Sequence, residues 1–110
     1  MERYNYKYWE AHNITCKNTI MKQHSSYGKG KLQVVRIEKI EVTKEKATYK
    51  YFPEDSSEFG VITFFRMTGK RCLVKELPGY DSKYYCKAMN RIVEYNDNGY
   101  FPQKGMIAWY

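Results

Sequence analysis

Residues 32–53 read LQVVRIEKIEVTKEKATYKYFP, and this stretch decides the fold. Its first part, residues 32–37, is rich in β-branched side chains, which is typical of a strand. The apolar positions change parity between Ile37 and Ile40. Because side chains alternate between the two faces of a strand, this change predicts a bulge or bend near Glu38.

The second part of the stretch predicts a partner for that strand. Residues 43–46 are polar and favour a turn. After them, Ala47, Tyr49 and Tyr51 share one face of a strand that ends at Pro53. We therefore expect residues 32–53 to form an antiparallel hairpin.

Downstream of the hairpin, the pattern predicts two more strands. Residues 53–58, PEDSSE, are expected to form an acidic surface turn whose carboxylates solubilise the loop. Residues 59–67 are apolar on both parities, which predicts a central strand. A turn at residues 68–70, with Gly69 in a left-handed conformation, then leads into a strand over residues 72–77, which Pro78-Gly79 ends.

Upstream of the hairpin, apolar residues occupy mainly even positions between Tyr4 and Ile20. This alternation predicts two strands joined by a turn near residues 11–13, although a helix over residues 9–22 is the alternative. Residues 22–30, KQHSSYGKG, have no periodicity and indicate a loop.

A helix is predicted near the C-terminus. Asp81 is a good N-cap, and Asn98-Gly99 is a stop signal. Between them, apolar residues recur at three- and four-residue spacing: Tyr84, Tyr85, Ala88, Met89, Ile92 and Val93. Residues 106–110 are apolar enough to form a short final strand or an arm beside the helix.

These elements predict an α+β fold for a single domain over residues 1–110. We expect an antiparallel, curved β-sheet of about five to six strands, with one C-terminal helix packed on one face and a short terminal strand or arm.

Charge and aromatic content favour binding. The chain has twelve tyrosines and a net charge of +7. Residues 1–53 carry eleven basic and five acidic residues, against eight and seven in residues 54–110. Such asymmetry suggests attraction to anionic partners. A coding bias that enriches Lys, Asn and Tyr would produce part of the same composition without selection for function.

The residues that perform catalysis are few and scattered. Cys16, Cys72 and Cys86 are odd in number and widely spaced, so we interpret them as small buried apolar residues without a disulfide framework. If His12 and Cys16 lie on one strand, they are about 13 Å apart, too far to share an ion. We therefore predict no catalytic residues, no metal site, no cofactor and no enzymatic activity.

The expected location is the cytoplasm. The sequence contains no apolar run of the length that a membrane span needs, and the N-terminal MERYNYKYWE has no apolar signal core.

Two functional hypotheses follow. In the first, the chain sequesters or inhibits a protein target, such as a toxin or other enzyme, as an immunity-type protein or a phage or mobile-element accessory inhibitor does. In the second, a basic, tyrosine-rich sheet surface binds RNA or single-stranded nucleic acid. We favour the first, because acids interleave with the bases and would repel phosphates.

The chain is expected to be a monomer or homodimer without membrane contact. The predicted partner-binding residues come from the loop and the strand after it: Tyr27, Lys29, Lys31, Arg36 and Lys39.

Overall fold

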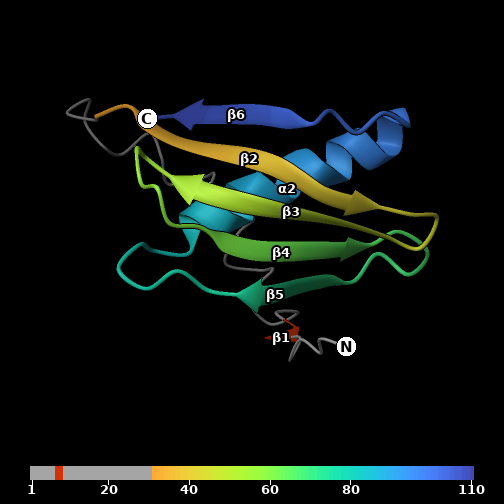
Figure 1. Cartoon of the computed structure of the whole chain (residues 1–110). Helices are drawn as coiled ribbons and strands as arrows, with labels where there is room; N and C mark the ends of the chain where they lie inside the picture. The colour runs from red at the N-terminus through yellow and green to blue at the C-terminus, as the bar shows by residue number, and fades with distance from the viewer. Residues whose placement is uncertain (1–6, 9–30) are drawn as a thin grey trace.

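The hairpin predicted over residues 32–53 supplies two neighbouring strands of a six-stranded antiparallel sheet (Figure 1). A computed structural model describes residues 7–8 and 31–110. The strands are β1 (Lys7–Tyr8), β2 (Gln33–Val42), β3 (Lys46–Pro53), β4 (Gly60–Phe65), β5 (Arg71–Lys75) and β6 (Lys104–Trp109). Their order across the sheet is β1-β5-β4-β3-β2-β6, and each neighbouring pair is antiparallel.

The β2–β3 pair confirms the predicted hairpin. Ile37 lies opposite Tyr51, and the register shifts between Lys39 and Glu41, close to the expected bend. In the turn, the Thr43 backbone N–H donates to the Lys46 carbonyl oxygen at 2.8 Å. The parity change in the sequence is therefore a β-bulge inside one long strand.

Helix α2 (Lys83–Asn98) packs behind the sheet in Figure 1, where it contacts β2, β3, β4 and β6. Ser82 occupies the N-cap position, one residue later than predicted. The Asp81 carboxylate still accepts the Lys83 backbone N–H at 2.9 Å, so it satisfies one of the otherwise unpaired donors of the first turn. Gly99 ends the helix with φ +78°.

The core lies between α2 and the sheet, and tyrosine rings fill much of it. Tyr49 and Tyr51 are almost fully buried. The Tyr49 hydroxyl donates to the Pro102 carbonyl oxygen at 2.6 Å, and the Tyr51 hydroxyl accepts the Leu77 backbone N–H at 3.1 Å. These bonds satisfy hydroxyls that burial would otherwise penalise.

The remaining strand predictions are also confirmed within residues 31–110. Strand β4 is buried along most of its length between β3 and β5, as two-sided apolarity predicted. Gly69 has φ +81° in the turn that follows. The C-terminal segment is a strand, β6, which pairs with β2. The α+β fold with a helix on one face of the sheet is thus confirmed.

At the N-terminal side, only β1 is described, and it pairs with β5. The choice between strand and helix over residues 9–22 lies outside the described residues, and so do the predicted turn at residues 11–13 and the loop at residues 22–30.

The two cysteines of the described chain differ in state. Cys72 keeps its thiol and is buried, as expected. Cys86, on the buried side of α2, is disulfide-bonded. The prediction that every cysteine is an unbridged core residue is therefore wrong for Cys86, because an odd count and wide spacing do not prevent a single bridge. Cys16 lies outside the described residues.

Within residues 7–8 and 31–110, no helix has the length and apolarity that a membrane crossing requires.

Candidate protein-binding surface

Strand β2 sends alternate side chains to two different environments. Val35 and Ile37 are buried in the core beneath α2. Val34 and Arg36 belong to the other parity and therefore point to the face of the sheet opposite α2, which we call the open face. On this face, the side chains of β6 are exposed and those of β2 are partly exposed, whereas Thr63 and Cys72 on the β4–β5 side are fully buried.

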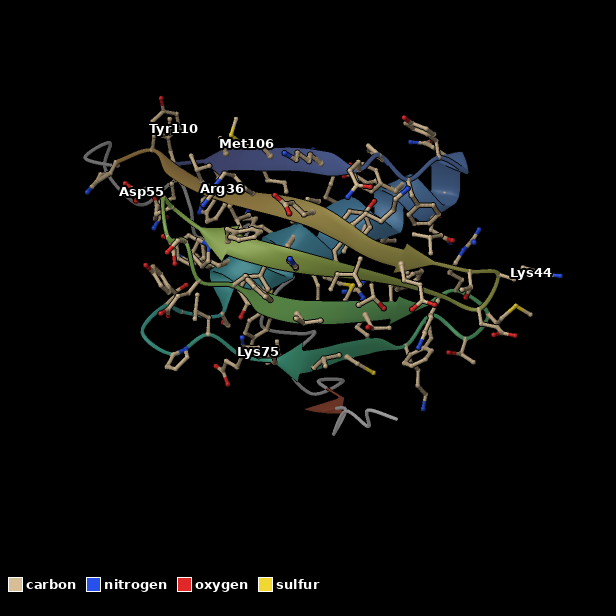
Figure 2. The ribbon with its side chains drawn as sticks, viewed as in Figure 1. Arg36, Lys44, Asp55, Lys75, Met106 and Tyr110 are labelled. Atoms are coloured by element: carbon tan, nitrogen blue, oxygen red, sulfur yellow. The ribbon has the colours of Figure 1, made fainter. Side chains whose placement is uncertain are left out.

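An apolar surface with one arginine lies where β2 and β6 meet on the open face. The register places Arg36 opposite Met106 and Val34 opposite Ala108. Leu32 and Tyr110 continue these two rows by one further alternate position. We call this set the corner surface: Leu32, Val34, Arg36, Met106, Ala108 and Tyr110. Figure 2 shows Arg36, Met106 and Tyr110 together at this corner.

The large apolar side chains of the corner surface are at least half exposed to solvent. Met106 is 59% exposed and Tyr110 is 68% exposed, and Leu32 is exposed by half. Scattered apolar side chains are normal at a protein surface, but a contiguous group marks an interaction site more often than chance placement does. The geometry therefore presents an apolar patch with a cation at its side.

Backbone carbonyl oxygens of the β3–β4 loop hold Arg36 in place. The Arg36 Nη2 donates to the Ser56 carbonyl oxygen at 2.6 Å, and its Nε donates to the Glu54 carbonyl oxygen at 3.3 Å. The side chain thus lines two adjoining hollows, one toward residues 54–57 and one toward Met106. A cation fixed in this way loses little conformational entropy when it binds a partner.

The same loop also contacts α2, through a carboxylate whose role the sequence did not predict. Glu54 has φ +52°. Its Oε2 accepts both the Tyr84 hydroxyl at 2.7 Å and the Val34 backbone N–H at 3.2 Å. Burial first, and the hydrogen bond to Glu54 second, raise the pKa of Tyr84 to about 12. The interpretation of Glu54 as a solubilising loop residue is therefore wrong.

A row of cations and phenyl rings crosses the open face beside the corner surface. The Arg36 guanidinium lies 4.9 Å from the centroid of the Phe52 ring, whose centroid is 5.5 Å from that of Phe59. Lys50 and Lys75 each place Nζ 4.5 Å from the Phe59 centroid. We call these five residues the cation–aromatic strip. Its rings are half-buried, and lysines already occupy the space over Phe59.

The sequence-predicted binding residues do not form one cluster in the described chain. Arg36 is on the open face, whereas Lys39 is on the helix side, where its Nζ donates to the Phe101 carbonyl oxygen at 3.0 Å. Lys31 is exposed just before β2. Tyr27 and Lys29 lie outside the described residues. A strand separates residues of opposite parity, and this separates Arg36 from Lys39.

Sequence reasoning missed Met106, Ala108 and Tyr110. A signal for them existed, because they alternate with Ile107 and Trp109 in the final strand. The sequence did not reveal where in the sheet that strand lies. Only the pairing of β6 with β2 brings its exposed row beside Arg36.

No protein-family model matches this chain, and neither a curated protein nor a solved structure matches it. Among residues 7–8 and 31–110, no group of three or more His, Cys, Asp or Glu side chains is placed to hold a metal ion.

Proposed function

We propose that the chain is a non-enzymatic binding protein that grips a protein target through the corner surface and so sequesters or inhibits it. The observation that carries this proposal is the exposed Met106–Tyr110 row beside the anchored Arg36. Methionine, tyrosine and arginine are enriched at protein–protein interfaces, and aromatic and arginine side chains dominate their hot spots. An immunity-type inhibitor or an accessory inhibitor of a phage or mobile element would need such a surface.

The cation–aromatic strip gives less support to the nucleic-acid hypothesis. Bases stack on open ring faces, but Lys50 and Lys75 already lie over Phe59. A base would have to displace a lysine before it could stack there. Tyr49 and Tyr51, which an exposed tyrosine sheet would need, are buried beneath α2. These observations favour a protein as the partner.

The proposal extends to the partners and the location expected from the sequence. The chain would act as a monomer or homodimer on a protein target, with no membrane contact and no cofactor. A cytoplasmic location remains a prediction. The disulfide bond at Cys86 is an observation against it, because such bonds persist mainly in oxidising compartments.

The test uses two methionines of similar exposure on different parts of the surface. Met106 belongs to the corner surface, and Met67, which is 75% exposed, follows β4. The immobilised chain is used to capture proteins from the cells that produce it, and the captured protein is then purified and titrated calorimetrically. Met106→Glu should weaken its binding at least tenfold, because a charge in the centre of an interface must be desolvated, and Met67→Glu should not.

Two results would contradict the proposal. Equal binding by the Met106→Glu and Met67→Glu variants would remove the corner surface from the interaction. Capture of RNA alone, with affinity that falls steeply between about 50 and about 200 mM salt, would favour the nucleic-acid hypothesis instead.

A further inference from the structure

We propose that the partner docks by adding a β-strand to the outer edge of β6, and that this strand alternates apolar and acidic side chains. This inference rests on the proposed function and specifies its mode. Among the described strands, β6 pairs with β2 alone, and Figure 1 shows it as the upper edge of the sheet. An edge strand presents a row of N–H and C=O groups with which another chain can pair.

The register identifies which backbone groups point outward from β6. The Lys39 N–H donates to the Gln103 carbonyl oxygen at 2.8 Å, so odd-numbered residues of β2 turn their backbone groups toward β6. The Glu54 N–H bonds the Val34 carbonyl oxygen at 2.8 Å, so even-numbered residues of β2 face β3. Hydrogen-bonded and non-hydrogen-bonded pairs alternate along an antiparallel ladder.

Gly105 and Ile107 lie opposite odd-numbered residues of β2 and therefore bond inward. Lys104, Met106 and Ala108 lie opposite even-numbered residues, so their N–H and C=O groups point outward. Two common protections of an edge strand are missing here, whereas Lys104 and the Arg91 guanidinium, which donates to the Met106 carbonyl oxygen at 3.5 Å, still shield part of it. Residues 104–109 contain no proline, and no register shift interrupts their pairing with β2.

The two sides of the β6 edge differ in chemistry. On the open face, the corner surface offers Met106 and Tyr110, which suit apolar side chains. On the helix side, the Arg91 Nη1 reaches the Met106 carbonyl oxygen at 3.5 Å, and the Lys87 Nζ is 5.4 Å from the Trp109 ring centroid. Side chains of an added strand would alternate between these two sides.

Charge complementarity therefore selects acids for the helix side. The charged side chains around this edge are Arg36, Lys87, Arg91 and Lys104, with the acids Glu38 and Glu94. Glu94 neutralises part of Arg91 through a 3.3 Å ion pair, and Glu38 lies on the open face opposite Lys104. On the helix side, Lys87 and Arg91 therefore outnumber the acid Glu94. On the open face, by contrast, Lys104 lies opposite Glu38 and Arg36 is bonded to loop carbonyl oxygens. The net charge of +7 also disfavours a second copy of this chain as the occupant.

The experiment uses a short blocked peptide of alternating valine and glutamate as the probe, with a valine–lysine peptide as the charge control. The chain variants are Ala108→Pro, which removes only an outward N–H, and Ala108→Ser, which keeps it. We expect the acidic peptide to bind the wild-type chain and the Ala108→Ser variant. Ala108→Pro should weaken binding at least tenfold, and the lysine peptide should bind at least tenfold more weakly than the acidic one.

A second measurement needs no substitution. Amide hydrogen exchange of Met106 and Ala108 should slow at least tenfold when the acidic peptide is added, because their outward N–H groups then acquire partners. Gly105 and Ile107, whose N–H groups already bond β2, should change little. Circular dichroism of the Ala108→Pro variant checks that the fold is kept.

The outcomes separate this inference from the proposed function. If exchange at Met106 and Ala108 does not change with peptide, or Ala108→Pro binds the peptide as Ala108→Ser does, strand addition is overturned. Protein binding would still stand if Met106→Glu abolishes capture of the cellular target while Met67→Glu does not. Equal binding of the two peptides would overturn the acidic preference, and concentration-dependent dimerisation that Ala108→Pro abolishes would assign the edge to a second copy instead.

Discussion

Tyr49, Tyr51 and Tyr84 each place a ring in the core and keep the hydroxyl on a defined partner. The phenol combines the apolar area of a large ring with one polar atom that must be satisfied. Burial is the largest cause that raises the pKa of each of these hydroxyls, to about 12 for Tyr51 and Tyr84. A core built in this way is sensitive to alkali.

The decrease in the free energy of unfolding at alkaline pH should therefore depend on the buried phenols. Below about pH 10 these tyrosines are neutral in both states. Between about pH 10 and 12 the unfolded chain loses phenolic protons that the folded chain retains, so the free energy of unfolding falls by about 1.4 kcal/mol per pH unit for each such proton. Tyr84→Phe should make this fall shallower in urea titrations at several pH values. Tyr110→Phe, at a residue that is 68% exposed and lies outside the core, is the control with which the slope of Tyr84→Phe is compared.

At the level of single residues, the sequence predicted which side chains face the core better than it predicted which side chains bond to one another. It placed Tyr49 and Tyr51 on one face and located the apolar positions of the helix correctly. It could not indicate that Glu54 reaches Tyr84, because these residues are 30 positions apart and meet only when the β3–β4 loop folds back onto α2. Arg36 was predicted as a binding residue, but its bonds to loop carbonyls depend on the same loop.

At the level of elements, Arg66 joins three segments that are distant in sequence. Its Nη1 donates to the Thr43 carbonyl oxygen at 2.7 Å, and its Nε donates to the Asn96 Oδ1 at 2.8 Å. The guanidinium also lies 5.0 Å from the centroid of the Phe101 ring. The β2–β3 turn, the end of α2 and the segment before β6 are thereby held together.

Arg66→Lys should destabilise the fold although the charge is kept. Lysine cannot present the planar fork that bonds two acceptors at once, and hydrogen bonds to charged groups contribute about 1.5–3 kcal/mol each. We expect a loss of about 1–3 kcal/mol in urea unfolding. Lys44→Ala, at an exposed position in the β2–β3 turn, should change stability by less than about 0.5 kcal/mol. A loss no larger than that of the control would mean that Arg66 does not hold these elements.

The elements themselves were largely readable from residues 31–110, because their periodicity is strong and their turns contain Gly69, Pro78-Gly79 and Gly99. The sheet order was not readable. Strand β6 is last in the chain and pairs with β2, the first strand of the hairpin. Strands β3, β4 and β5 and helix α2 separate the two strands in the sequence. Local pattern carries no information on such a distant pairing, so the corner surface was hidden from sequence reasoning.

At the level of the whole molecule, the state of the cysteines offers a direct check. Denatured but unreduced protein should react with an alkylating reagent at Cys72 and not at Cys86, and reduction should open Cys86 to the reagent. Peptide mass mapping reads both sites. Reduction should also lower the unfolding temperature, since a disulfide typically stabilises by about 2–4 kcal/mol. Labelling of Cys86 without reductant would contradict the bridge.

The bridge at Cys86 also has a consequence for where the molecule can persist. Glutathione and thioredoxin systems tend to open such links inside ordinary cells, whereas secreted and surface proteins retain them. If this chain meets its target beyond the cell envelope, the disulfide bond persists and restrains α2. If it meets its target inside, the bond is open to reduction, and the chain then loses the stability that the bond contributes.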